Sequence, residues 1–283
     1  MPILVDFNQV MHSIIAIQPK KLKLDEDLTR HIILTCLRSY KMKFSKEYGE
    51  LIICCDSKQY WRREIFPYYK AKRAEARNAS SLNWPAIFEM LNKIKAEINE
   101  NFPYKYIEIN RAEADDIIAV LTKYISENSF GNAEKILILS GDKDFIQLGN
   151  PSVKQYDPTR KRWITSENAD VYLKEHIIRG DKGDGIPNVR SRDNFLISRN
   201  KHEKAPTISK SFIENFNLTI CSDEINRNYL RNKQLIDLTC IPDDVIMKII
   251  NSYVSQISKS KSKLFNYFVK NNLKHLMTNI NDF

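Results

Sequence analysis

Short apolar runs alternate with amphipathic stretches along the first half of the chain. The apolar runs have the length and continuity of buried β-strands and lie at residues 3–5, 51–55, 106–109 and 136–139. The amphipathic stretches carry apolar residues at helical spacing and lie at residues 25–48, 84–98 and 113–127. Asn83 suits the cap of the second helix, and Pro85 is tolerated in its first turn. The alternation predicts an α/β fold with a mostly parallel central sheet flanked by helices.

The second half of the chain has a different pattern. After about residue 165 the strand-like runs stop, and the remaining residues predict helices, for example at 243–254. We therefore place a soft boundary near residue 180. It divides the chain into an α/β part, residues 1–180, and a helical part, residues 181–283.

Acidic residues follow the ends of three predicted strands. Asp6 ends the first apolar run, Asp56 the second, and Asp142 follows the fourth after a Ser-Gly pair. Sites in open α/β sheets form outside the carboxyl ends of the strands, so we expect these side chains to converge. Taken singly, each is equally well explained as a turn residue or a helix cap. With nearby acidic motifs they form one candidate set: Asp6, Asp56, Glu113, Asp115, Asp116, Asp142, Asp144, Asp181 and Asp184.

Such a cluster of carboxylates predicts bound cations. Like charges at close range raise one another's pKa and destabilise the fold unless a cation binds. Carboxylate oxygens suit Mg²⁺ or Mn²⁺, and the set is too large for one ion. Two ions about 3.5–4 Å apart are the usual arrangement for phosphodiester hydrolysis. We therefore expect two Mg²⁺ ions, with Mn²⁺ able to replace them.

Composition limits the class of protein. A formal net charge of +9 and a pI near 9.1 favour a polyanionic partner, either nucleic acid or an anionic membrane surface. No apolar run approaches the roughly 20 residues of a membrane span, and the first residues enter a strand, so no signal peptide is expected. The five cysteines lack C-x-x-C spacing, which is typical of a reducing cytosol. We expect a cytoplasmic protein without a membrane segment.

Other catalytic motifs are absent from the sequence. There is no P-loop and no G-x-G-x-x-G, and the chain has only seven glycines. No H-E-x-x-H and no G-x-S-x-G occurs either. Asp6-Phe7-Asn8 lacks the second aspartate of the aspartate-nucleophile phosphatases. We interpret all five histidines as ordinary core or surface residues: His12, His31, His176, His202 and His275.

Residues 58–77 interleave basic and aromatic side chains. Tyr68-Tyr69-Lys70, for example, directly precedes Lys72-Arg73. A charge run is often only a solvated face, and grouped tyrosines often belong to the core. Aromatic rings stack on bases while cations contact phosphates, so the interleaving favours a single-stranded nucleic acid as the partner.

Six motifs together resemble the structure-specific 5′-nuclease family, most of all its phage-encoded members. This family comprises flap endonucleases and the 5′-nuclease domains of bacterial DNA polymerases. The motifs occur in the family's order and are I-L-V-D-F-N at 3–8, C-D at 55–56 before W-R-R, Y-Y-K-A-K-R at 68–73, E-A-D-D at 113–116, S-G-D-K-D-F at 140–145 and R-G-D-K-G-D at 179–184. The similarity extends to the C-terminal residues.

The resemblance assigns the acids to two ions. The first ion is surrounded by Asp6, Asp56, Glu113, Asp115 and Asp116. The second lies among Asp142, Asp144, Asp181 and Asp184, some of them acting through water. The resemblance further implies that Lys70 and Arg73 are catalytic residues that hold the scissile phosphate.

The resemblance also implies where the nucleic acid lies. Tyr69 is expected near the displaced nucleotide, and residues 58–100 form an arch or bridge through which a 5′ single strand passes. Residues beyond about 170 form a helix-three-turn-helix unit that binds duplex DNA. The expected nucleic-acid contacts are Tyr69, Lys72, Arg77, Arg190, Arg192, Arg199 and Lys201.

One departure from the family's pattern affects the duplex contact. Most members follow the G-D-x-x-D motif with a Gly-Ile-Gly loop that contacts the backbone and a monovalent cation. Here Gly185-Ile186 continues with Pro187 and no glycine hairpin follows, so backbone amides approach phosphate less closely. Arginine and lysine side chains at 190–204 are candidates to replace that contact. A monovalent-cation site is left open.

The resulting hypothesis is a Mg²⁺-dependent 5′→3′ exonuclease and flap endonuclease. It removes RNA primers and 5′ flaps during phage DNA replication. Its expected partners are duplex DNA with a 5′ flap or fork, RNA–DNA hybrid and a single-stranded-DNA-binding protein at the C-terminal half, and we expect a monomer. Two alternatives stay open at this point. One is a branched-DNA binding protein without catalysis, and the other is a compact acidic-site ribonuclease of the toxin type.

Overall fold

A six-stranded sheet forms the centre of the computed structural model, which describes residues 1–17, 25–128, 134–165, 168–200, 202–257 and 259–283. In sheet order the strands are β3 (Lys105–Glu108), β2 (Glu50–Cys55), β1 (Pro2–Asp6), β4 (Ile136–Leu139), β5 (Val153–Asp157) and β6 (Arg162–Ile164). All neighbouring strands are parallel except β5 and β6, which are antiparallel. The predicted mostly parallel sheet is confirmed, whereas β5 and β6 were not among the predicted strands.

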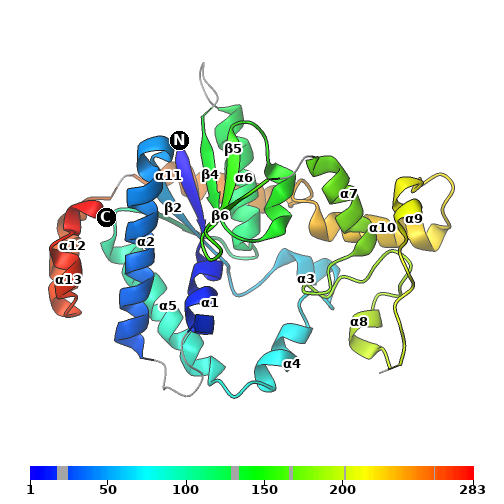
Figure 1. Cartoon of the computed structure of the whole chain (residues 1–283), viewed down its shortest axis with the longest axis horizontal. Coiled ribbons are helices and arrows are strands. Elements are labelled where there is room, and N and C mark those ends of the chain that lie inside the picture. The colour runs from blue at the N-terminus through cyan, green and yellow to red at the C-terminus, as the bar shows by residue number, and fades with distance from the viewer. Residues whose placement is uncertain (18–24, 129–133, 166–167, 201, 258) are drawn as a thin grey trace.

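Helices cover both faces of the sheet (Figure 1). Those of the first half are α1 (Phe7–Ile17), α2 (Glu26–Tyr48), α3 (Trp61–Ile65), α4 (Lys72–Asn78), α5 (Trp84–Asn101) and α6 (Ala114–Glu127). Ile3 and Val5 of β1 belong to the apolar cluster with α1, α2 and α5, whereas Leu4 belongs to the cluster with α6. Burial on both faces explains why the strands are continuously apolar in sequence. As predicted, the Asn83 side chain caps α5, and Pro85 lies in its first turn.

The described residues after about 165 form helices and no strand, as predicted. The helices are α7 (Ala169–Arg179), α8 (Phe195–Ser198), α9 (Lys210–Glu214), α10 (Asp223–Ile236), α11 (Asp243–Ser255), α12 (Leu264–Lys270) and α13 (Lys274–Met277). Three 3₁₀-helices complete the described elements: η1 (Lys143–Leu148), η2 (Lys261–Lys263) and η3 (Ile280–Asp282). In Figure 1, α7 to α10 extend to one side of the sheet, and α12 and α13 lie on the opposite side.

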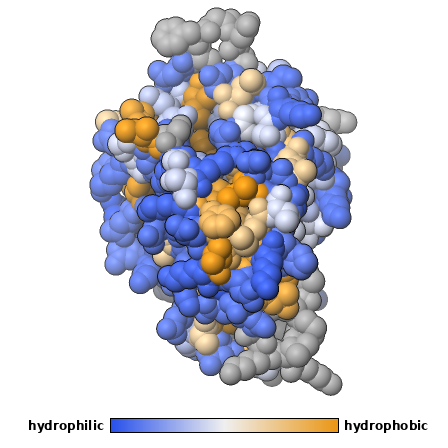
Figure 2. All heavy atoms as spheres, turned by 90° about the vertical axis from the view of Figure 1, so that its left-hand side faces the viewer, coloured by the Kyte–Doolittle hydropathy of each residue, from blue (hydrophilic) through white to orange (hydrophobic). Residues whose placement is uncertain are grey.

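The last part of the chain packs back on the sheet layers. Val245 of α11 lies in the same apolar cluster as α6. Phe268 and Phe283 are fully buried in the cluster that contains β1. The face on the side of α12 and α13 carries an apolar patch framed by hydrophilic residues (Figure 2). The division of the chain near residue 180 stays a prediction.

The parallel register places the ends of three strands at one edge. Asp6 pairs in register with Cys54, and Val5 with Leu139. The residues that follow these strands, among them Asp56 and Asp142, therefore leave the sheet at the same edge, where α6 also begins. This edge is the place at which the predicted acids should meet.

Candidate active site

The predicted acids form one continuous cluster. Asp6 lies close enough to Asp56 and Asp142, which follow the neighbouring strands, for their charges to raise its pKa. The charges of Asp142 and Asp6 likewise raise the pKa of Asp115, in the first turn of α6. From there the cluster continues to Asp144, whose pKa is raised by the charges of Asp142, Asp184 and Asp181. Residues distant in sequence are therefore brought together, as the strand-end pattern predicted.

Without a bound cation, the carboxylate cluster lowers the stability of the fold. Burial, followed by the charge of Asp56, raises the pKa of Asp6 from 3.8 to about 7. Burial and the charge of Asp142 raise the pKa of Asp144 to about 7 as well. The pKa values of Asp56 and Asp115 are also raised, again mainly by burial. The negative charge of one carboxylate raises the pKa of its neighbours, and a bound cation would lower those pKa values again. The donor set therefore fits divalent ions that prefer oxygen ligands.

The loop after β4 is held by residues that sequence analysis did not identify. Ser140 Oγ donates to Asp6 Oδ2 at 2.9 Å and accepts from Asp142 N at 3.1 Å. The Gln155 side-chain amide donates to the backbone carbonyls of Ser140 and Asp142. A Cβ at Gly141 would lie 2.9 Å from the Asp157 carboxylate, so glycine is needed for this approach. Ser140 lies inside a recognised motif, but nothing in the sequence pointed to Gln155, because β5 was not predicted.

Asp116 occupies a structural position. It is completely buried, and its carboxylate accepts from both terminal nitrogens of Arg62 at 2.7 and 3.0 Å. It also accepts from Trp61 Nε1 at 3.1 Å and from Glu113 N at 2.9 Å. Both oxygens are therefore engaged by protein donors. These contacts hold Arg62 and the start of α6, and the predicted place of Asp116 around the first ion stays a prediction.

Lys70, Tyr69 and Arg73 lie against the acidic cluster. The buried Lys70 ammonium contacts Glu113 and lies 3.5 Å from Asp184 Oδ2. Although burial lowers the pKa of Lys70, the charges of Glu113 and Asp184 outweigh it and raise that pKa. Tyr69 Oη lies 2.9 Å from a carboxylate oxygen of Glu113 and 2.9 Å from one of Asp184, and can donate its single proton to either; Arg73 Nη2 lies 2.7 Å from Asp184 Oδ1. Residues 69–73 of the basic-aromatic segment are thus attached to the carboxylates by hydrogen bonds and ion pairs.

The loop at 180–185 is fixed against the same segment. Lys70 N donates to Asp184 O at 2.7 Å. Gly185 has a φ of +78°, and a Cβ there would lie 2.7 Å from Tyr68 O. The left-handed conformation and the close approach both require glycine. The sequence motif at 179–184 and the motif at 68–73 are therefore parts of one unit.

His176 is a member of the site that sequence analysis missed. It lies on α7, with Nδ1 3.3 Å from Asp144 Oδ1 and Nε2 3.3 Å from Asp181 Oδ2. One ligand atom from each of these three residues lies within 4.8 Å of the others. The interpretation of His176 as an ordinary core or surface residue is therefore wrong. No motif spacing marks it, since the contact depends on how η1 packs against α7.

A basic and aromatic pocket of about 480 Å³ opens next to Asp56. Trp84 and Phe88 of α5 lie with their ring centroids 5.7 Å apart, and the Arg77 guanidinium lies 5.7 Å from the Phe88 centroid. Trp84 Nε1 is buried and has no hydrogen-bond partner among the described residues. The lining residues come from the β1–α1 region, the basic-aromatic segment and α5: Asn8, His12, Asp56, Lys58, Tyr60, Arg63, Lys70, Arg73, Ala76, Arg77, Trp84 and Phe88.

The predicted duplex contacts lie on or beside α8, apart from this pocket. Arg190, Arg192 and Arg199 are exposed. The Arg190 guanidinium stacks 4.0 Å from the Phe212 ring, and Arg192 forms a two-pronged ion pair with Glu203. Lys201 lies outside the described residues.

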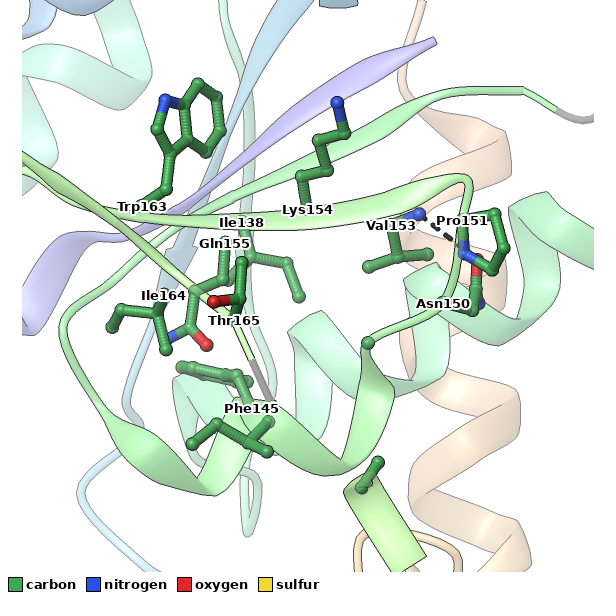
Figure 3. A pocket seen from close by; sticks show the side chains of 13 residues that line it. Ile138, Phe145, Asn150, Pro151, Val153, Lys154, Gln155, Trp163, Ile164 and Thr165 are labelled. Atoms are coloured by element: carbon green, nitrogen blue, oxygen red, sulfur yellow. Dashed lines mark hydrogen bonds between the residues drawn. The ribbon is translucent and has the colours of Figure 1, made fainter. Parts of the chain in front are cut away.

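A larger cavity, of about 660 Å³, lies away from the carboxylates (Figure 3). Its walls come from β5, β6 and η1, and Phe145, Trp163 and Ile164 give it a mainly apolar lining. None of the predicted acids lines it. We therefore do not assign it to the active site, although Gln155 belongs to both.

An acidic cluster at the edge of a parallel sheet, with a basic-aromatic segment attached to it, defines a class of nuclease. The chain belongs to the 5′-3′ exonuclease family: its sequence matches the family described as "5'-3' exonuclease, N-terminal resolvase-like domain" over residues 2–177. Residues 166–283 match the family described as "T4 RNase H, C terminal". The predicted resemblance, the fold class and the assignment to the 5′→3′ nucleases are confirmed.

Individual relatives agree with this membership. The chain is 35% identical to Ribonuclease H of Enterobacteria phage T4, over 99% of this chain and 95% of that protein. It is 33% identical to Flap endonuclease Xni of Shewanella sediminis over 46% of this chain and 49% of that enzyme. The chain thus spans nearly all of the phage protein and about half of the bacterial one.

Solved structures share the fold at lower identity. One is a flap endonuclease of bacteriophage T5 in a pseudo-enzyme–product complex with DNA and metal ions, with a TM-score of 0.63 and 18% identity over 89% of this chain and 97% of that one. Another is the T5 5′-exonuclease with divalent zinc ions, with a TM-score of 0.64 and 18% identity over 90% and 98%. Among the described helices of the present protein, none is long and apolar enough to cross a membrane.

Proposed function

We propose that the protein is a 5′→3′ exonuclease and flap endonuclease that hydrolyses RNA primers and 5′ flaps on duplex DNA during phage DNA replication. The observation that carries the proposal is the attachment of Lys70, Tyr69 and Arg73 to the carboxylate cluster. This attachment supports a role for the two basic side chains in holding a phosphate beside the proposed site for divalent ions. We further propose that it acts as a monomer in the cytoplasm of the phage host.

The carboxylates would hold two Mg²⁺ ions, with Mn²⁺ able to substitute. Candidates for the first ion are Asp6, Asp56, Glu113, Asp115 and Asp116, and candidates for the second are Asp142, Asp144, Asp181 and Asp184, some of them acting through water. When bound, such a pair of ions supplies a nucleophilic water and stabilises charge on the leaving oxygen. The fit is supported by the raised pKa values of buried acids that face one another.

The protein's own residues would position the substrate. Lys70 and Arg73 contact the scissile phosphate and stabilise its growing charge. The pocket beside Trp84 and Phe88 receives bases of the displaced 5′ strand by stacking. Residues 58–100 guide that strand as an arch.

The helical part would bind the rest of the nucleic acid. Residues 181–283 form the duplex-binding region, with Arg190, Arg192 and Arg199 on backbone phosphates and Lys201 and Lys72 as further contacts. We also propose that this half docks a single-stranded-DNA-binding protein, for which the family resemblance is the support.

The test is product mapping on a 5′-labelled flap and on a nicked RNA–DNA hybrid, with Mg²⁺ varied. We expect cleavage near the junction that requires the divalent ion and is abolished by EDTA. Asp142→Asn should remove cleavage while duplex binding in Ca²⁺ stays within a few-fold of wild type. Full binding without cleavage by the wild-type protein would instead indicate a non-catalytic branched-DNA binding protein.

A further inference from the structure

His176 lies between two acids of the second ion site that come from different elements. Asp144 belongs to η1, after β4, and Asp181 follows α7. The imidazole lies 3.3 Å from a carboxylate oxygen of each, through a different ring nitrogen. The side chain is 14% exposed, so water has little access to it.

The two ring nitrogens differ in what they contact. Nε2 is hydrogen-bonded with Asp181 Oδ2, whereas Nδ1 is buried and makes no hydrogen bond within the described residues despite its short distance to Asp144. A buried polar nitrogen without a partner is unfavourable by about 1–3 kcal/mol. With the ring proton on Nε2, the lone pair of Nδ1 points to the side on which Asp144 lies.

Both oxygens of Asp181 already have partners in the protein, which favours a role through His176 over direct contact with the second ion. Its Oδ1 accepts from Gly183 N at 2.6 Å and from Asp184 N at 3.0 Å, and its Oδ2 contacts His176. A carboxylate that holds one nitrogen of a histidine while the other nitrogen binds a metal is a recurrent arrangement. For bonds of about 2.0–2.1 Å, neighbouring ligand atoms of one ion lie about 2.9–3.4 Å apart, and the Nδ1–Oδ1 separation falls in that range.

We propose that His176 supplies a nitrogen ligand to the second divalent ion, which it shares with Asp144, and that Asp181 positions its ring. The proposal rests on the two-ion site of the proposed function, and it adds a preference for particular metals at the second ion. Imidazole suits Zn²⁺, Fe²⁺ and Ni²⁺ best, whereas Mg²⁺ prefers carboxylate and water oxygens; Mn²⁺ also prefers oxygen ligands, but as a transition metal it accepts a nitrogen ligand more readily than Mg²⁺ does. The second site therefore favours Mn²⁺ over Mg²⁺ more strongly than an all-carboxylate site does.

A different role for His176 predicts the opposite result. If the ring is a permanent cation that neutralises Asp144 and Asp181, it competes with any metal. Its removal would then tighten Mn²⁺ and Mg²⁺ binding alike, and a lysine at this position would restore wild-type affinity for both ions.

The experiment measures Mn²⁺ binding to the full chain by the loss of the free-ion EPR signal, with Mg²⁺ as competitor. For His176→Ala we expect about a 10–100-fold loss of Mn²⁺ affinity at one site and less than about a three-fold change for Mg²⁺. His176→Lys should show the same loss. His275→Ala, at an exposed histidine of α13, is the matched control and should behave as wild type.

A second measurement tests ligation directly. The protein is labelled with ¹⁵N-histidine, and the resonance that disappears in His176→Ala is assigned to His176; with five histidines in the chain this comparison is practical. Adding Zn²⁺ should shift the Nδ1 resonance of that ring. An unchanged Mn²⁺/Mg²⁺ ratio, tighter binding of both ions, or rescue by lysine would overturn the proposal. Flap cleavage by the wild type, measured in parallel, separates these outcomes from a failure of the proposed function.

Discussion

Lys70 is the residue whose contacts best separate chemistry from binding. It is buried against Glu113 and Asp184, and its charge faces the place proposed for the scissile phosphate. Because the phosphate gains negative charge in the transition state, Lys70→Ala should lower the single-turnover rate by about 10²–10³-fold and change substrate affinity much less. Rates in Mg²⁺ and binding in Ca²⁺ measure the two effects.

Lys123→Ala is the matched control for Lys70→Ala. It removes the same charge at an exposed position of α6, where the described residues show no ion pair between Lys123 and the acidic cluster. Its single-turnover rate should stay within a few-fold of wild type. Weaker binding without a slower chemical step in Lys70→Ala would contradict the assigned role.

The acids also determine how stability depends on pH. Asp6 and Asp144 have pKa values of about 7 in the folded chain, against 3.8 ordinarily. Between these values the folded state binds more protons than the unfolded state, so the metal-free protein should lose stability as pH rises from about 4 to 7. Saturating Mg²⁺ should reduce this loss, because it binds the ionised folded state.

Thermal melts from pH 5 to 8, in EDTA and in Mg²⁺, measure this effect. Asp6→Asn removes one of the groups with a raised pKa and should flatten the pH dependence of the melting temperature in EDTA. Equal pH dependence with and without Mg²⁺ would show that the acids do not share a metal site.

At the scale of elements, α4 and α5 form the pocket proposed for the displaced strand. Trp84→Ala removes a ring next to Phe88 and should weaken binding of a 5′ single-stranded flap by about 1–3 kcal/mol. Binding of the same duplex without a flap should be unchanged. Trp163→Ala is the matched control, since this partly exposed tryptophan of β6 lines the other cavity. Equal effects on both substrates would place the strand elsewhere.

The region around α8 is proposed to bind the duplex backbone. Replacing Arg190 and Arg192 by alanine should weaken binding to all duplex sequences alike. The slope of log affinity against log salt should fall by about 0.9 for each phosphate that is no longer neutralised. Arg160→Ala, at the exposed turn between β5 and β6, should leave that slope unchanged. An unchanged slope in the double variant would assign duplex binding to other residues.

Elements with a clear periodicity could be predicted, and those without one could not. The four strands at 3–5, 51–55, 106–109 and 136–139 and the helices α2, α5, α6 and α11 are where the pattern places them. β5 was missed because Gln155 and Asp157 are polar yet buried: the Gln155 amide nitrogen donates to the loop after β4, and Asp157 accepts from the turn after β5. α1 was missed because it follows Asp6 without any break in the apolar pattern.

From the sequence alone, the acids could be predicted to lie at one edge of the sheet, but their individual roles could not be assigned. Asp116 and Asp115 are adjacent in sequence, yet one is saturated by Arg62 and Trp61 and the other faces the cluster. His176 and Gln155 reach the site only through tertiary packing. Side-chain partners across elements therefore decide these functions, and no local pattern encodes them.

At the scale of the whole molecule, residues from both halves of the chain contact one another at the acidic cluster. Arg62 connects α3 to Glu113 and Asp116 and donates from Nε to Leu235 O at the end of α10. The loop at 180–185 contacts the segment at 68–70. The proposed arch, the proposed duplex-binding region and the metal site are thus mechanically connected by buried contacts.

The order of the strands also has a consequence for synthesis on the ribosome. β1 is made first, but its sheet neighbours are residues 50–55 and 136–139, and Phe268 and Phe283 belong to the cluster on one of its faces. The nascent chain therefore carries β1 with one edge unpaired until residue 139 has emerged, and with part of one apolar face uncovered until the last residues follow. Such a strand is prone to aggregate, so chaperones that shield it during translation should raise the yield of folded protein.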